Sequence, residues 1–71
     1  MTREAAAHEL VVSAVAYLAD MAWDEPDVVS AARALPRKDW QAEAAKIAGS
    51  GVSPYSRLYA ARLAWHRHAN A

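Results

Sequence analysis

Apolar positions recur along most of the chain at the three- and four-residue spacing of an α-helix, and turn-forming residues divide them into segments. The segments run over residues 3–23, 28–35, 40–48 and 54–68. No stretch alternates with the two-residue period of a half-buried strand. The pattern therefore predicts an all-α fold, a small bundle of three to four helices in which the last two form a helix-turn-helix-like pair.

Residues with known preferences for helix ends support these boundaries. Short polar side chains precede three of the segments, and proline occupies the first turn of two. Gly49 follows the third segment, where we expect it to end the helix in a left-handed conformation. The residues predicted to begin helices are Thr2, Pro26, Asp39, Ser53 and Pro54.

The segment 3–23 is apolar on most sides. Its large apolar residues, spaced at 100° intervals, cover well over half of the circumference: Leu10, Val11, Val12, Val15, Tyr17, Leu18, Met21 and Trp23. The narrow polar strip consists of Glu9, Ser13, Ala16 and Asp20. Such a helix needs neighbours on nearly every side, so it is either the central helix of the domain or part of a homodimer interface. The dimer interpretation would use Val11, Val12, Val15 and Leu18.

The last segment has charged residues within its apolar arc. That arc, which we expect to be buried, consists of Tyr55, Leu58, Tyr59, Leu63 and Trp65. Arg62 and His66 fall in the middle of it, one turn apart. A buried arginine needs a partner, so we expect either an ion pair with an acid near the first helix or contact with an acidic group of another molecule. The intramolecular candidates are Asp20, Asp24 and Glu25.

Size and composition limit the possibilities further. Seventy-one residues make a single all-α domain, residues 1–71, with marginal stability unless oligomerisation or tight helix packing helps. Alanine occupies 19 positions, which favours helices that approach closely. Cysteine is absent, so neither disulfides nor thiolate metal sites can contribute. The apolar run 10–23 is too short to span a bilayer and contains polar residues, so we expect a cytoplasmic protein without a targeting segment.

The net charge of zero conceals an uneven distribution. Before Arg33 there are six acids and one base, and from Arg33 onward seven bases and two acids, so the halves carry −5 and +5. Two interpretations follow. The basic half binds nucleic acid or an acidic partner, or the two halves neutralise each other within a monomer or dimer.

Metal binding and catalysis have little support. His66 and His68 lie two residues apart, so they point in different directions on a helix, and His8 is distant in the sequence. No serine lies in a nucleophile motif, and the 49–51 segment lacks the full glycine pattern of a dinucleotide site. We expect no enzyme, no metal and no cofactor.

The segment 44–58 resembles bacterial and phage helix-turn-helix regulators. The similarity rests on Ala44-Ala45-Lys-Ile-Ala48, then Gly51-Val52-Ser53-Pro54 and Ser56-Arg57-Leu58. In that family the second helix enters the major groove of DNA and its first residues contact bases. The resemblance thus implies that the DNA-contacting residues are Ser53, Tyr55, Ser56 and Arg57.

These observations predict a small non-enzymatic binding protein, of the kind that phages and mobile elements encode as inhibitors or regulators. Its basic C-terminal helices would contact a protein with an acidic or nucleic-acid-binding surface, and the alternative is a DNA-binding regulator. The candidate partner-binding residues are Arg57, Arg62, His66, Arg67, Lys46, Arg37 and Lys38.

Overall fold

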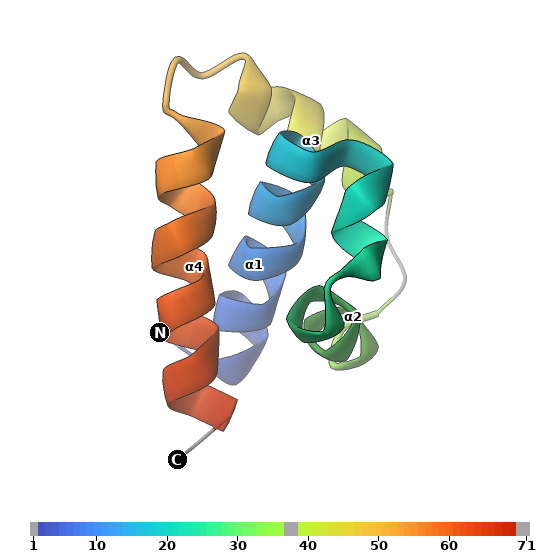
Figure 1. Ribbon diagram of the computed structural model, residues 1–71, viewed down its shortest axis with the longest axis vertical. Helices are drawn as coiled ribbons and strands as arrows, with labels where there is room; N and C mark the ends of the chain where they lie inside the picture. The colour runs from blue at the N-terminus through green and yellow to red at the C-terminus, as the bar shows by residue number, and fades with distance from the viewer. Residues whose placement is uncertain (1, 37–38, 70–71) are drawn as a thin grey trace.

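Helices account for most of the chain, as the apolar spacing predicted. The computed structural model describes residues 2–36 and 39–69, and within these ranges it contains four α-helices, one 3-10 helix and no strand. The elements are α1 (Arg3–Leu18), η1 (Ala19–Asp24), α2 (Pro26–Arg33), α3 (Trp40–Ala48) and α4 (Pro54–Ala69), shown in Figure 1. The all-α small bundle is confirmed.

The predicted helix starts are correct. The side-chain oxygens of Thr2, Asp39 and Ser53 each accept a hydrogen bond from the backbone N–H three residues further on, at 3.1, 3.2 and 3.4 Å. Each bond satisfies one of the donors that a helix leaves unpaired at its start. Pro26 is the first residue of α2, which spans Pro26–Arg33 instead of 28–35.

Two further helix ends differ from the prediction. The first helix does not continue to Trp23, because Ala19 adopts a positive φ of 53° and its N–H bonds to the carbonyl of Val15, after which the chain continues as η1. Gly49 is not left-handed, since its φ is −83°. The positive φ of this turn belongs to Gly51, at 80°, because the turn after α3 extends to the two residues beyond Gly49.

The first helix is the central element of the fold. α2, α3, α4 and η1 all pack against α1, and α4 lies along it in the antiparallel direction (Figure 1). Val11, Val12 and Val15 are 0%, 2% and 7% exposed inside the single chain, and Leu18 packs partly buried against the core. The valines expected at a homodimer contact are therefore covered by the rest of the same chain, so a dimer would have to use another surface.

The apolar stretch formed by α1 and η1 is longer than the run 10–23 that was considered from the sequence. Taken together, Arg3–Asp24 is long and apolar enough to cross a membrane by length and composition. Half of its most apolar window is buried inside the protein, and the core helix of a soluble protein has the same properties. The buried residues of this stretch lie mainly in α1, which packs against α2, α3 and α4.

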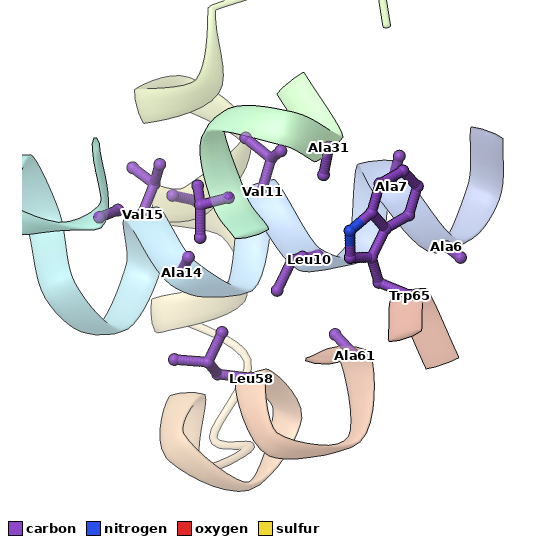
Figure 2. Packing of buried hydrophobic residues seen from close by; sticks show 13 residues of the cluster. Ala6, Ala7, Leu10, Val11, Ala14, Val15, Ala31, Leu58, Ala61 and Trp65 are labelled. Carbon is purple, nitrogen blue, oxygen red and sulfur yellow. The ribbon is translucent and has the colours of Figure 1, made fainter. Parts of the chain in front are cut away.

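Small side chains let α4 lie close to α1. Figure 2 shows Leu58, Ala61 and Trp65 of α4 directed toward Leu10 and the alanines of α1. The cluster also includes Val28 and Ala31 from α2 and Ala44 from α3. Most of these residues are alanine or valine, so the core depends on close backbone approach more than on bulky side chains.

Ser13 is an exception to the predicted polar strip of α1. It is completely buried, and among the described residues its hydroxyl has no hydrogen-bond partner. An unsatisfied buried hydroxyl costs about 1–3 kcal/mol. Its small size fits the closely packed centre of the bundle, which explains why this position is covered although the side chain is polar.

Candidate protein-docking face

The buried face of α4 differs from the predicted arc. Leu58 and Trp65 are buried as expected, but the third buried residue is Ala61. Tyr55, Tyr59 and Leu63, which the sequence pattern placed in the core, are 58%, 61% and 47% exposed. The alanine-rich side of α1 packs against the stripe of α4 that has the small Ala61 at its centre. The tyrosines of α4 therefore face outward.

Arg57 secures one flank of the buried stripe. Arg62 follows it five positions later, which places the two side chains about 140° apart on the helix, on opposite sides of Leu58 and Ala61. The Arg57 Nε donates to Glu9 Oε1 of α1 at 2.6 Å, and Nη2 donates to Oε2 at 3.4 Å. This two-point contact is the geometry in which arginine binds a carboxylate most firmly.

Arg62 secures the opposite flank. Its Nε donates to Asp27 Oδ2 of α2 at 2.7 Å, and Nε2 of His66 lies 3.6 Å from the same oxygen. An intramolecular ion pair was one of the two expectations for Arg62, but Asp27 is not among the three candidate acids that were named from the sequence. Asp27 lies in the first turn of α2, where its Oδ1 also accepts the backbone N–H of Val28 at 2.9 Å. Arg62 and His66 thus lie at the edge of the buried stripe and not in its middle.

These pairs join the acidic and basic halves of the chain. A third contact, between His8 Nε2 and Glu43 Oε2 at 3.1 Å, links α1 to α3. The observed pairs support the interpretation that the halves partly neutralise each other within one chain. In the free protein, Arg57, Arg62 and His66 are engaged in these contacts, and their role toward a partner stays a prediction.

The other candidate basic residues are distributed differently. Lys46 on α3 and Arg67 near the end of α4 are exposed, and within residues 2–36 and 39–69 neither has an ion-pair partner. Arg37 and Lys38 lie outside the described residues. The basic side chains therefore do not form one continuous surface in the part of the chain that is described.

Between Tyr55 and Leu63 the exposed residues of α4 form an uncharged stripe rich in tyrosine, and the exposed His66 and Arg67 follow it at the C-terminal end. The charged residues of its middle turns, Arg57 and Arg62, are held at the flanks by their ion pairs. Tyr55 also contacts Tyr17 of α1, with ring centroids 5.4 Å apart and planes at 63°. We call this surface the outer face of α4, and it comprises Tyr55, Ser56, Tyr59, Ala60 and Leu63, all of them exposed.

The residues implied in DNA contact are only partly available. Ser53, Tyr55 and Ser56 are exposed at the start of α4, but Arg57 is bound to Glu9. α3 and α4 pack principally against α1 and not against each other. Using Arg57 to read a base would thus require breaking an ion pair that holds α4 on α1.

Two open hollows accompany these features. One, of about 370 Å³, lies between α1 and α3 and is lined mostly by alanines with Asp20 and Gln41 at its polar positions. The other, of about 340 Å³, lies beside Trp40 and His8. Among the described residues, no three acidic or histidine side chains are placed to hold a metal ion. Thr2, Glu4 and His8 are among the residues that line the second hollow, where the Thr2 hydroxyl accepts the Ala5 N–H at 3.1 Å.

Searches of known protein families, of curated proteins and of solved structures found no match to this chain. The functional interpretation therefore depends on the chain's own residues.

Proposed function

We propose that this chain is a non-enzymatic cytoplasmic binding protein, of the inhibitor or regulator kind that phages and mobile elements encode. It acts by docking on another protein through the outer face of α4. The observation that carries the proposal is the exposure of Tyr55, Tyr59 and Leu63 on successive turns of one helix. Tyrosine is enriched in protein interfaces and charged residues are depleted from their centres, which is the composition of this face.

The basic residues have a secondary part in this proposal. Arg57 and Arg62 maintain the position of α4 through Glu9 and Asp27, so they fix the direction in which the tyrosines point. Arg67 is exposed beyond the C-terminal end of the outer face and is able to meet a carboxylate of the partner. The partner surface would then be an apolar recess with acidic residues at one end, as found in helix-in-groove recognition.

The experiment compares capture of cellular proteins by matched variants. The tagged wild-type chain, Tyr59→Lys and Ser30→Lys are incubated with nuclease-treated lysate of the cell that encodes the protein. Tyr59 is on the outer face, whereas Ser30 is exposed on α2, so both variants add one charge but only one alters the proposed contact. We expect a defined protein to bind the wild type and Ser30→Lys and to be lost with Tyr59→Lys.

A second comparison tests the acidic end of the recess. Arg67→Glu should weaken binding of the captured protein, and Arg33→Glu, which reverses an exposed charge on α2, should leave it unchanged. Arg57→Glu is unsuitable because it would also break the contact with Glu9. Capture of no protein, or capture that is indifferent to Tyr59→Lys, would contradict the proposal.

The DNA-binding alternative predicts a different outcome. Capture would then be lost on nuclease treatment, and duplex DNA would bind with an affinity whose log–log slope against salt is about −0.9 per phosphate contact. The engagement of Arg57 by Glu9 gives this alternative less support than protein docking.

A further inference from the structure

The outer face of α4 is able to pair with the same face of a second copy of the chain. Tyr55, Tyr59 and Leu63 follow one another at four-residue intervals, so Tyr59 is the midpoint of the stripe. If two such helices lie antiparallel about a two-fold axis at Tyr59, Tyr59 meets its own copy and Tyr55 meets Leu63. Ser56 and Ala60 beside the stripe are small, which permits the helix axes to approach to about 8–10 Å.

The charges around the outer face also favour contact with a second copy of this chain. Between Tyr55 and Leu63 the face presents no charge, because Arg57 and Arg62 are turned to Glu9 and Asp27 and the exposed Arg67 lies one turn beyond Leu63. A second copy presents an equally uncharged surface, so neither side has to desolvate an unpaired charge. The net charge of the chain is zero, and the absence of net repulsion promotes self-association.

The available area fits a weak dimer. A tyrosine side chain buries about 150–250 Å² in full, so three tyrosines exposed by about half offer roughly 300 Å² per copy. Here Tyr17, beside Tyr55, joins the two tyrosines of α4, with 49%, 58% and 61% of each exposed. With the smaller residues of the face, two copies would bury on the order of 1,000 Å², the range of weak, reversible complexes.

We propose that in the free protein the outer face of α4 is covered by a second copy of this chain, in an antiparallel arrangement about Tyr59. This inference rests on the proposed function in one respect, namely that the outer face is a docking surface. It adds regulation to that function. Because the same residues contact the second copy and the partner protein, the dimer must dissociate before the partner binds.

Sedimentation equilibrium of the purified chain tests this arrangement. The wild type and Ser30→Lys should rise from the monomer mass of 7.7 kDa toward twice that value as concentration increases. The concentrations should extend from about 5 to about 500 µM, because interfaces below about 1,200 Å² form weak complexes. Tyr59→Lys should stay monomeric at all concentrations, since it places like charges together at the axis. At low concentration, where the wild type is also monomeric, its circular dichroism and melting temperature should match the wild type, which excludes misfolding as the cause.

Disulfide trapping distinguishes the antiparallel arrangement from others. The chain contains no cysteine, so a single introduced thiol is the only one present. Under mild oxidation, Tyr59→Cys should form a covalent dimer rapidly, because the two Cβ atoms meet at the axis. Tyr55→Cys and Leu63→Cys should each crosslink slowly alone and rapidly when mixed. Rapid crosslinking of all three variants alone would indicate a parallel pair and overturn the arrangement.

The possible failures are distinguishable. A wild type that stays at 7.7 kDa throughout, or a Tyr59→Lys variant as dimeric as the wild type, overturns the inference. If the monomeric protein still captures a partner that requires Tyr59, the proposed function survives. A dimer that requires Tyr59, together with no captured protein, supports the inference and removes the proposed function.

Discussion

α4 carries two apolar stripes of similar length, and the fold buries one of them. The inner stripe, Leu58, Ala61 and Trp65, is 2–4% exposed, whereas Tyr59 and Leu63 of the outer face remain about half or more exposed. The outer face contains more large side chains than the inner stripe. The amount of apolar surface therefore does not explain which side of α4 faces α1.

The difference between the stripes follows from shape and from charge. The side of α1 that faces α4 is formed by Leu10 and alanines. A helix with Ala61 at this contact approaches α1 more closely than one with Tyr59 there. Close approach increases the number of favourable atom contacts per residue. Rotating α4 to bury Tyr59 would also separate Arg57 from Glu9 and Arg62 from Asp27. Tight packing and two flanking ion pairs thus favour the observed orientation together.

The largest contrast is expected between truncations of the two stripes. Trp65→Ala removes the largest buried side chain of α4 and its contact with Arg3, whose guanidinium carbon lies 5.1 Å from the ring centroid. It should lower the free energy of unfolding by about 3–5 kcal/mol. A single core in a chain this short rarely supplies more than about 3–5 kcal/mol, so that loss is most or all of its stability. Tyr59→Ala should change it by less than about 0.5 kcal/mol in the monomer.

Chemical denaturation at low protein concentration measures both variants, because dilution removes any contribution from self-association. If Tyr59→Ala proved as destabilising as Trp65→Ala, the assignment of inner and outer stripes would be incorrect.

An intermediate contrast comes from enlarging the small residues. Ala61→Leu inserts a bulky side chain between α1 and α4 and should destabilise the fold by about 1–3 kcal/mol. Ala60→Leu makes the same change on the exposed side and should alter stability by at most about 0.5 kcal/mol. Thermal unfolding followed by circular dichroism is sufficient to compare them. Equal melting temperatures would mean that close approach at Ala61 does not determine the orientation of α4.

The smallest contrast concerns the flanking arginines. Arg57→Gln should lower the free energy of unfolding by about 0.5–1 kcal/mol, as is usual for a partly exposed ion pair. Arg67→Gln, which removes an arginine without a partner among the described residues, should have no measurable effect. A double-mutant cycle of Glu9→Gln with Arg57→Gln isolates the pair, and its coupling should fall in high salt. Zero coupling would remove this ion pair from the explanation of the orientation of α4.

Local features of the fold were predictable where short-range chemistry decides them. The caps at Thr2, Asp39 and Ser53 depend on a side chain and a backbone N–H three residues away, and all three form. The break at Ala19 was missed, because alanine is the best helix former and gives no local indication of a positive φ. The left-handed conformation was assigned to Gly49 instead of Gly51, because both glycines permit it and the sequence does not distinguish them.

The candidate site was predicted less well. Tyr55 was named as a DNA contact and also assigned to the core, and Tyr59 and Leu63 were assigned to the core alone. Arg57 was named both as a DNA contact and as a partner-binding residue. Periodicity identifies apolar positions on a helix without stating which of two neighbouring stripes meets the next helix. The acid that pairs with Arg62 was also misplaced, because Asp27 reaches it only after the chain turns through η1 into α2.

The sequence by itself determined that this protein is all helical, where most of its helices begin and that the first helix is apolar enough to lie at the centre. These properties follow from local propensity and from the total apolar content of each segment. The tertiary structure decided which side of α4 is covered, which charges are paired and that the tyrosines remain outside. Those outcomes depend on the shape of α1 and on residues distant in the sequence, so they are settled only when the helices pack.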